Sequence, residues 1–324
     1  MQSRRVMTGA LVFALAAFAS WAGAQDWPSR PIRIVVPAAP GGGTDLIARV
    51  IGEKVREGLK EAVIIENKPG ADEVIGADYV AKSPADGYTV FFSAANIVVN
   101  PSLKAKLPFD SSKDFQPVAK IATLPYVLII NPKLPVRTLP ELVAYSQKKP
   151  EGLNAAIGGT ANMLVTELFR LKTGAKMTFI PYKGCGPATQ AVLSAETDLA
   201  FCSAPALAQF VLNGRLTALA ITGDKRLSML PDVPTAREVG GDAYDIDLSQ
   251  WVAAFYPANT PPAITAKLNA EINKALAAPD VVAKIAQLGA EPTPISVDET
   301  TKFYRAELAK FKDLVTRAGI PVEN

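Results

Sequence analysis

The sequence predicts an α/β protein made of two doubly wound lobes. Short strands rich in β-branched residues alternate along the chain with segments of helical periodicity, which is typical of a parallel sheet covered by helices. The alternation occupies both halves of a chain of 324 residues, a length that suits two domains or one large one. With 49% hydrophobic and 20% charged residues, the composition is that of a folded soluble protein.

The first half contains strands and helices in regular order. Strands are predicted over 32–36, 62–66 and 88–93, and loops that contain glycine and proline follow the first two. Helices are predicted over 44–59 and 74–83. The apolar residues of the first helix keep helical spacing; they are Leu46, Ile47, Val50, Ile51, Val55 and Leu59.

The second half continues this order without visible sequence repetition. Strands are predicted over 126–130, 153–157, 178–182, 198–203 and 216–222. Helices are predicted over 139–148, 163–172, from 187 onward, and over 266–277, 281–288 and 297–318. Pro187 suits the first turn of its helix, because its missing N–H has no intrahelical partner there. No low-complexity linker separates the two halves.

Histidine is absent from the sequence and cysteine occurs twice. A Ser-His-Asp triad, an HExxH zinc site and an imidazole base are therefore excluded. Two cysteines also cannot supply a four-thiolate metal site within one chain. We expect no metal, no cofactor and no catalytic residues.

The first 24 residues have the layout of a secretory signal peptide. Arg4 and Arg5 form a basic start, an apolar stretch follows, and Ala22-Gly23-Ala24 matches a cleavage site. We expect cleavage after Ala24 and export to the periplasm, by the general or the twin-arginine route. Removing two of the 34 basic residues leaves 32 against 31 acidic ones, so we expect no nucleic acid partner.

Three predicted strands lead through small residues into a helix, at 40–45, 158–162 and 183–187. The first N–H groups of a helix have no internal partner, so such a start can hold an anion. The alternative is a routine turn, with Thr44 and Asp45 as helix caps. A dinucleotide site is a rival: Gly41, Gly43 and Glu66 fit its fingerprint, but Leu46 stands where the third glycine belongs.

Further motifs, in the same order along the chain, resemble the Bug family, the periplasmic substrate-binding proteins of tripartite tricarboxylate transporters. The segments that carry the resemblance are Trp27-Pro28-Ser29-Arg30-Pro31-Ile32, Pro40-Gly41-Gly42-Gly43-Thr44-Asp45, Glu66-Asn67-Lys68-Pro69-Gly70-Ala71, Ser83-Pro84-Ala85-Asp86-Gly87-Tyr88-Thr89, Phe109-Asp110, Asp114-Phe115, Pro181-Tyr182-Lys183-Gly184, Leu230-Pro231-Asp232-Val233-Pro234-Thr235 with Glu238, and Thr260-Pro261-Pro262. The resemblance extends over essentially the whole mature chain.

The resemblance implies a two-lobed type II periplasmic binding-protein fold that closes on its ligand. It implies a first domain of residues 25–125 plus 250–324 and a second of 126–249, with crossings near Pro125 and Trp251. We expect Trp251 to pack in the core or hinge, with contact to the ligand as the alternative. Carried onto this sequence, the implied ligand-binding residues are Ala38, Pro40, Gly41, Gly42, Gly43, Thr44, Asp45, Ser93, Ala94, Ala95 and Asn96 in the first domain, and Gly158, Gly159, Thr160, Ala161, Asn162, Tyr182, Lys183, Gly184, Cys202 and Ser203 in the second.

The sequence departs from the family pattern at three places that bear on the ligand. Ala38 stands where relatives often carry Phe, Met163 lies near a position that often holds His, and Cys185 replaces a glycine. We hypothesise a ligand bulkier and less polar than an acidic amino acid, such as a longer or aromatic dicarboxylate, with terephthalate as one candidate. The alternative is neutral drift around a ligand held by the backbone. Lys183 either contacts the ligand or is a solvated or carboxylate-paired lysine.

In an exported chain, two cysteines suggest a disulfide. Cys185 and Cys202 each lie near the end of a predicted strand, and a strand-helix-strand unit can bring them together. A separation of their Cα atoms above about 7 Å would forbid the bond. Two small buried thiols are the alternative.

We therefore expect a monomeric periplasmic protein that captures a carboxylate and presents it to the membrane permease subunits of a tripartite tricarboxylate transporter. An exported enzyme on a similar scaffold is a second hypothesis, although no convincing acid–base pair is visible. An adaptor that senses the ligand and signals to a membrane partner is a third. The adaptor would use the same cleft as the transport protein.

Overall fold

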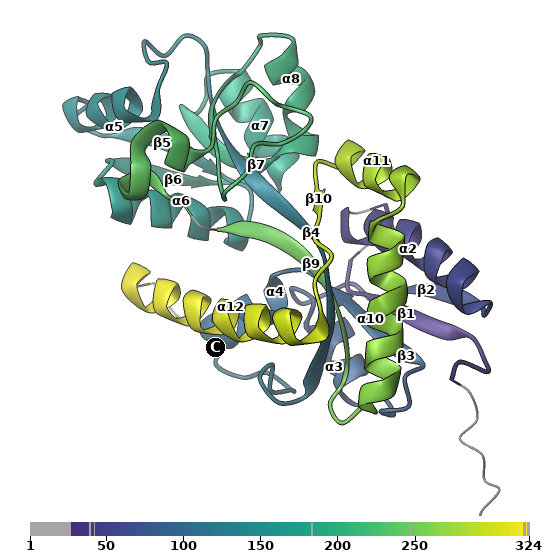
Figure 1. The fold of residues 1–324 in the computed structure, drawn as a ribbon. Helices are drawn as coiled ribbons and strands as arrows, with labels where there is room; N and C mark the ends of the chain where they lie inside the picture. The colour runs from purple at the N-terminus through teal and green to yellow at the C-terminus, as the bar shows by residue number, and fades with distance from the viewer. Residues whose placement is uncertain are drawn as a thin grey trace, which may run out of the picture.

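The computed structural model describes residues 27–38, 40, 41, 43–182, 184–246, 248–319 and 322. The predicted signal peptide and its cleavage site lie outside the described residues. Two α/β lobes lie side by side and are joined by two long strands (Figure 1). None of the helices in the described part of the chain is both long and apolar enough to cross a bilayer.

Lobe one is built on a mixed sheet and is formed by the N-terminal and C-terminal parts of the described chain. Its strands, in sheet order, are β2 (Val63–Asn67), β1 (Ile32–Val36), β3 (Thr89–Ser93), β9 (Ser249–Pro257) and the first part of β4 (Phe115–Ile130), with β10 (Glu291–Pro292) paired to β4. The strands β2, β1 and β3 are parallel, whereas β9 runs antiparallel to β3 and β4. The helices of this lobe are α2 (Gly43–Leu59), α3 (Val74–Ala81), α4 (Asn96–Leu103), α10 (Pro262–Leu276), α11 (Pro279–Gln287) and α12 (Val297–Ala318).

Lobe two is formed by the middle of the chain. Its strands are the second part of β4, then β7 (Leu199–Ser203), β5 (Leu153–Ile157) and β6 (Met177–Pro181), with β8 (Thr217–Ile221) on the other edge of β4. Its helices are α5 (Leu139–Lys148), α6 (Thr160–Thr173), α7 (Cys185–Leu193), α8 (Ala208–Leu212) and α9 (Ala236–Gly240), with 3-10 turns η2 (Ala204–Ala206) and η3 (Gly241–Tyr244).

Strand β4 passes from one lobe into the other. Pro125 is its last residue paired to β9, opposite Ser249, and Tyr126 is its first residue paired to β7, opposite Ser203. The sequence predicts only the second part of this strand, since Pro117 and Pro125 are unusual within a strand. Both prolines lie in register with β9, and the pairing shifts next to Pro117. Strand β9 and helix α4 are further elements that the sequence analysis does not predict.

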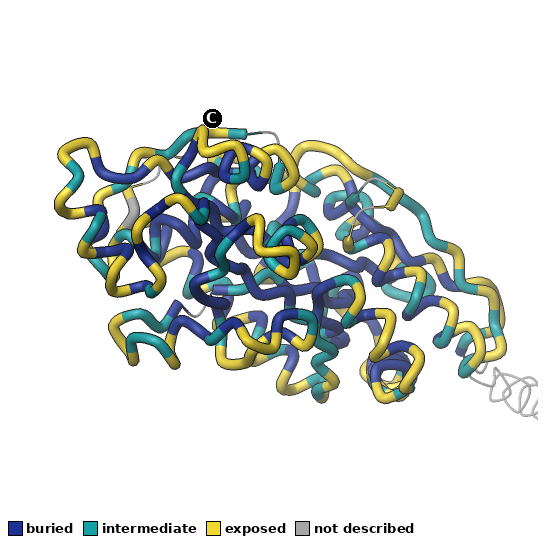
Figure 2. The backbone as a smooth tube through the Cα atoms, turned by 90° about the horizontal axis from the view of Figure 1, so that it is seen from above, coloured by how far each residue is buried: buried dark blue, intermediate teal, exposed yellow. Residues whose placement is uncertain are grey.

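Apolar side chains fill the space on both faces of the strands. Helix α2 buries Ile47, Ile51 and Val55 against the sheet of lobe one, which is the face that its helical spacing predicts. A larger cluster, which includes Phe91, Phe255 and Phe169, extends from lobe one into lobe two. Figure 2 shows the consequence: the strands in the middle of the molecule are buried, and the exposed backbone lies on the outer helices and loops.

Candidate functional site

Two adjoining cavities lie between the lobes. The first, the asparagine cavity, has a volume of about 340 Å³ and is lined by Asn96, Asn100 and Asn162 among others. The second, the apolar cavity, measures about 460 Å³ and includes Leu46 and Leu124 in its wall. Thr44, Ala94 and Gln250 line both cavities, so the two form one interlobe cleft.

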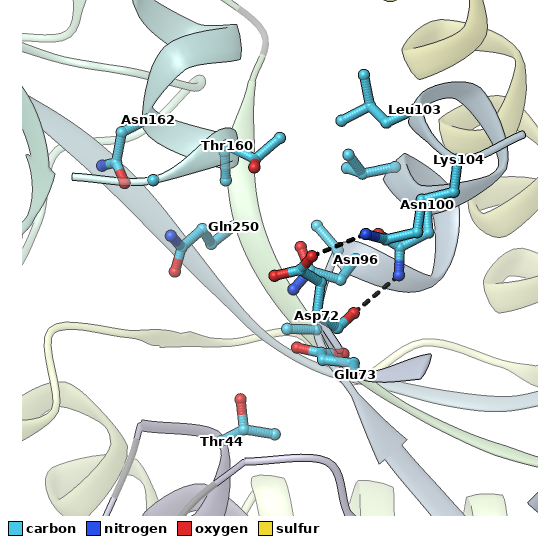
Figure 3. Close-up of a pocket in the computed structure, with 15 residues that line it drawn as sticks. Thr44, Asp72, Glu73, Asn96, Asn100, Leu103, Lys104, Thr160, Asn162 and Gln250 are labelled. Atoms are coloured by element: carbon cyan, nitrogen blue, oxygen red, sulfur yellow. Dashed lines mark hydrogen bonds and ion pairs between the residues drawn. The ribbon is translucent and has the colours of Figure 1, made fainter. Parts of the chain in front are cut away.

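The lobe-one wall of the cleft comes from three chain segments. Thr44 lies at the start of α2, Ala94 and Asn96 lie where β3 leads into α4, and Asp72 and Glu73 precede α3. Figure 3 shows Thr44, Asp72, Glu73 and Asn96 around the asparagine cavity, with Gln250 of β9 between the two lobes. Amide and hydroxyl groups that can donate or accept hydrogen bonds thus form part of the wall of this cavity.

The lobe-two wall contains the start of helix α6. Gly159 precedes the helix with φ 148°, and Gly184 precedes α7 with φ 104°, both in a region that favours glycine. Among the described residues, no side chain caps either helix, whereas Thr138 caps α5 and Ser296 caps α12. The first N–H groups of α6 are therefore available to an anion in the cleft.

Asp45 positions the glycine loop at the start of α2. Its buried carboxylate accepts hydrogen bonds from the Gly41 N–H (2.9 Å), Arg49 Nε (2.9 Å) and Asn67 Nδ2 (2.9 Å). Burial by itself would raise the pKa of Asp45, but the hydrogen bonds and charge of Arg49 and the bonds from Gly41 and Asn67 outweigh it and lower the pKa. Asp45 thus acts on the shape of the loop.

An acidic segment forms part of the cleft wall. Ala71, Asp72 and Glu73 all have positive φ, at 47°, 52° and 76°, which is uncommon for residues other than glycine. Asp72 pairs with Lys104, the residue after α4, at 2.9 Å, and Glu73 Oε2 accepts a hydrogen bond from Ser93 Oγ at 2.9 Å. Burial raises the pKa of Glu73 to about 7, although the bonds from Ser93, the Ala94 N–H and Asn96 favour the ionised form. Asp72 and Glu73 are not among the residues expected from the sequence, because a run of positive φ values has no clear sequence signal when glycine is absent.

Eleven of the residues proposed from the sequence lie in the walls of the cleft. They are Gly41, Gly43, Thr44, Ala94, Ala95, Asn96, Gly159, Thr160, Ala161, Asn162 and Ser203. The other described members of the set lie outside the two cavity walls; they are Ala38, Pro40, Asp45, Ser93, Gly158, Tyr182, Gly184 and Cys202. Gly42 and Lys183 fall outside the described residues.

Several of the residues outside the walls are held by contacts of their own, and one of them bonds to a wall residue. Ser93 bonds to Glu73, the Ala38 carbonyl accepts a bond from Asn67 Nδ2 (2.9 Å), and Tyr182 Oη donates to Glu196 (2.9 Å). Cys202 is joined to Cys185 by a disulfide, with their Cα atoms 5.6 Å apart. In the part of the chain that the structure describes, no group of His, Cys, Asp and Glu is arranged to hold a metal ion.

Residues 47–320 match the model of one protein family, described as the tripartite tricarboxylate transporter family receptor. The chain belongs to this family. The receptor is also 36% identical over 313 residues to the protein BugT of Bordetella pertussis, an alignment that covers 95% of each chain. The resemblance to the Bug family is therefore confirmed.

Solved structures of related proteins resemble the whole receptor. One is Rpa4515 of R. palustris with adipate, at 32% identity and a TM-score of 0.78, covering 92% of this chain and 100% of that chain. Another is MatC of Rhodopseudomonas palustris with bound malate, at 30% identity and a TM-score of 0.72, covering 89% and 100%. The two-lobed α/β fold expected for a periplasmic binding protein is confirmed by these similarities and by the arrangement of the lobes.

The receptor's cleft includes residues that sequence reasoning missed. Gln250 lies on β9, a strand that is not predicted from the sequence. Asn100 lies in α4 and Lys104 directly follows it, and α4 is not predicted either. Asn100 Nδ2 donates to the Asp72 carbonyl at 2.8 Å and so joins α4 to the acidic segment. Only the loops at strand ends had a sequence signal that pointed to the cleft.

Proposed function

We propose that this receptor is a periplasmic solute-binding protein that captures a carboxylate in the interlobe cleft. It would then present the ligand to the membrane permease subunits of a tripartite tricarboxylate transporter. The observation that carries the proposal is the cleft itself, where the glycine-flanked start of α6 faces amide and hydroxyl groups of lobe one. Contacts with both lobes would favour the closed state of the protein.

The proposed ligand is a dicarboxylate, and the chemistry of the cleft supports a long one. The asparagine cavity offers polar contacts for one carboxylate, while Leu46, Leu124 and Val252 give the adjoining cavity an apolar wall for a carbon chain or ring. Two related receptors have been solved with adipate and with malate. Adipate and terephthalate are therefore the first candidates, and Gly41, Gly43 and Thr44 are proposed to contact the second carboxylate.

Thermal-shift screening followed by calorimetry tests this function. Adipate, terephthalate, malate, citrate and glutamate would each be added to the mature protein. We expect the longer or aromatic dicarboxylates to raise the melting temperature most, because bound ligand stabilises the folded state. Binding of citrate or glutamate alone would refute the proposed ligand class, and binding of no carboxylate would refute the function.

The same samples separate a carrier from an enzyme. We propose that the receptor binds without chemistry, so a stabilising ligand should be recovered unchanged after prolonged incubation. Formation of a product would favour the exported enzyme instead. An adaptor for a membrane signalling partner would bind the same ligand, and co-purification from membranes would identify permease subunits or a sensor.

We further propose domain boundaries and a route of export. The first domain would comprise residues 25–125 plus 250–324 and the second 126–249, which agrees with the change of pairing partner between Pro125 and Tyr126. The signal peptide would be removed after Ala24. Mass spectrometry of the protein recovered from the periplasm should then give a chain that starts at Gln25, and any other start would refute this site.

A further inference from the structure

A disulfide lies directly behind the lobe-two wall of the cleft. Cys185 is the first residue of α7, and Cys202 belongs to β7, next to Ser203 in the apolar cavity. The bond therefore joins the start of a helix to the end of a strand that borders the cleft. Cys202 is fully buried and Cys185 is partly exposed.

Asn162 connects this disulfide to helix α6. It lies in the first turn of α6, is 5% exposed and lines the asparagine cavity. Its Nδ2 atom donates to the Phe201 carbonyl at 2.7 Å and lies 3.2 Å from Cys185 Sγ. One amide group thus contacts β7, the disulfide and the start of α7 while its own helix faces the cleft.

The loops before α6 and α7 also pack backbone to backbone. A Cβ atom added to Gly158 would lie 2.8 Å from the Gly184 carbonyl carbon and 2.8 Å from the Cys185 nitrogen. These contacts leave no room for a side chain, so the backbones before α6 and α7 lie in direct contact. The Tyr182 N–H bond to the Ile157 carbonyl (2.8 Å) links the same two loops.

We propose that the Cys185–Cys202 disulfide positions the lobe-two half of the cleft through Asn162 and Gly158, so that ligand affinity depends on its redox state. This inference rests on the proposed function in one respect: adipate, the proposed ligand, is used to measure the change in affinity. Neither cysteine lines the asparagine cavity. The bond acts by holding the starts of α6 and α7 together before a ligand arrives, which reduces the ordering needed on binding.

Reduction of the bond requires an external dithiol. A thiolate of the dithiol attacks the partly exposed Cys185 sulfur and Cys202 leaves as the thiolate; the second thiol then releases Cys185. Two electrons and two protons pass to the cysteines, and the dithiol becomes a cyclic disulfide. The start of α7 is then held to β7 only by noncovalent contacts.

Hydrogen–deuterium exchange without ligand is the first test, with dithiothreitol as the dithiol. On reduction we expect amides in 158–163 and 184–188 to exchange about tenfold faster, because local opening of these two loops would then cost less free energy. The double variant C185A/C202A should show the same exchange without reductant and should not respond to it. Gly158→Ala, with the bond intact, should also loosen both loops.

Adipate calorimetry is the second test. Reduction, the double variant and Gly158→Ala should each weaken adipate binding about tenfold, the size expected when about one hydrogen bond to the ligand is lost. The control is Ser146→Ala, which removes the bond from the Lys176 N–H to Ser146 Oγ (3.1 Å) on α5. It should lower the melting temperature of lobe two but leave adipate affinity and the exchange of both loops unchanged.

The outcomes distinguish a failure of the positioning role of the disulfide from a failure of the proposed function. Two free thiols per denatured, unreduced chain would overturn the inference, and so would unchanged loop exchange after complete reduction. Loosened loops with adipate affinity unchanged within about twofold would also overturn it. If oxidised protein binds no adipate, the proposed ligand fails, while the exchange experiment still decides whether the disulfide positions the loops.

Discussion

At the scale of single residues, Glu73 has the most unusual surroundings in the cleft wall. Its backbone lies in the left-handed region, it lines the asparagine cavity, and burial raises its pKa to about 7. The charged groups beside it are Asp72 in its own segment and Lys104 following α4. A neutral Glu73 can donate a hydrogen bond to a ligand carboxylate, whereas an ionised Glu73 would repel it.

The raised pKa of Glu73 makes stability depend on pH. Between its ordinary pKa of 4.5 and about 7, the folded state holds a proton that the unfolded state has released. The free energy of unfolding therefore falls as the pH rises through this range. We expect Glu73→Gln to equal the parent near pH 5 and to exceed it near pH 8 by up to about 3 kcal/mol in urea unfolding. Glu151→Gln, at an exposed position, controls for the loss of one charge.

The same proton should govern ligand affinity. Because adipate is an anion, parent protein with neutral Glu73 should bind it best below about pH 7, and each further pH unit above that should cost up to about tenfold. Glu73→Gln should bind adipate with nearly the same affinity over this range. Calorimetry in buffers of different ionisation enthalpy would show uptake of a proton by the parent. Parallel pH profiles for the two proteins would contradict this role of Glu73.

Asp45 acts on the cleft through the loop that it holds. Asp45→Ala removes the acceptor for the Gly41 N–H and for Arg49, and should lower the free energy of unfolding by about 1 to 3 kcal/mol. Adipate affinity should also fall, since Gly41 and Thr44 lose their fixed position. Asp45→Asn is the matched control because it keeps the shape and one acceptor oxygen. It should lose less stability and less adipate affinity than Asp45→Ala. Unchanged affinity in Asp45→Ala would place the loop outside the ligand site.

At the scale of elements, the sequence predicts regular strands and helices better than the segments that join the lobes. The strand at 32–36 and the helix at 139–148 match the structure, because their apolar spacing and boundary residues agree. Strand β4 begins eleven residues before its predicted start, across Pro117 and Pro125, and α4 contains Pro101. Pairing with β9 and packing against α12 override these local signals. The glycine loops of the site were predictable, but Gln250 was not, since its strand was missing.

Helix α12 is held at its start by a capping box. Ser296 Oγ accepts from the Glu299 N–H (3.2 Å), and Glu299 Oε2 accepts from the Ser296 N–H (2.9 Å). We expect Ser296→Ala to lower the free energy of unfolding by about 1 kcal/mol. Ser296→Asp should keep most of the stability of the parent, because Asp also caps a helix start. Adipate affinity should not change, because Ser296 lines neither cavity of the cleft. Equal stability of Ser296→Ala and the parent in urea unfolding would contradict this account of the helix start.

At the scale of the whole molecule, the two lobes meet along β4 and β9, and Trp251 lies at their junction. It is 2% exposed, and its Nε1 donates to Glu307 of α12 at 2.8 Å. It also lines both the apolar cavity of the cleft and a third cavity of about 270 Å³, whose walls include Thr222 of lobe two and Phe303 of lobe one. A change in the angle between the lobes must therefore alter the surroundings of Trp251.

Tryptophan emission should report this change. The sequence has three tryptophans, of which Trp21 lies in the predicted signal peptide and Trp27 packs against Tyr88 within lobe one. In mature Trp27→Phe, Trp251 is thus the one remaining tryptophan, and adipate should shift its emission as in the parent. Trp251→Phe should bind adipate but lose the shift, because Trp27 keeps its neighbours when the lobes move as rigid bodies. A ligand-induced shift that survives in Trp251→Phe and disappears in Trp27→Phe would show that binding rearranges lobe one internally, and would contradict closure about the β4–β9 junction.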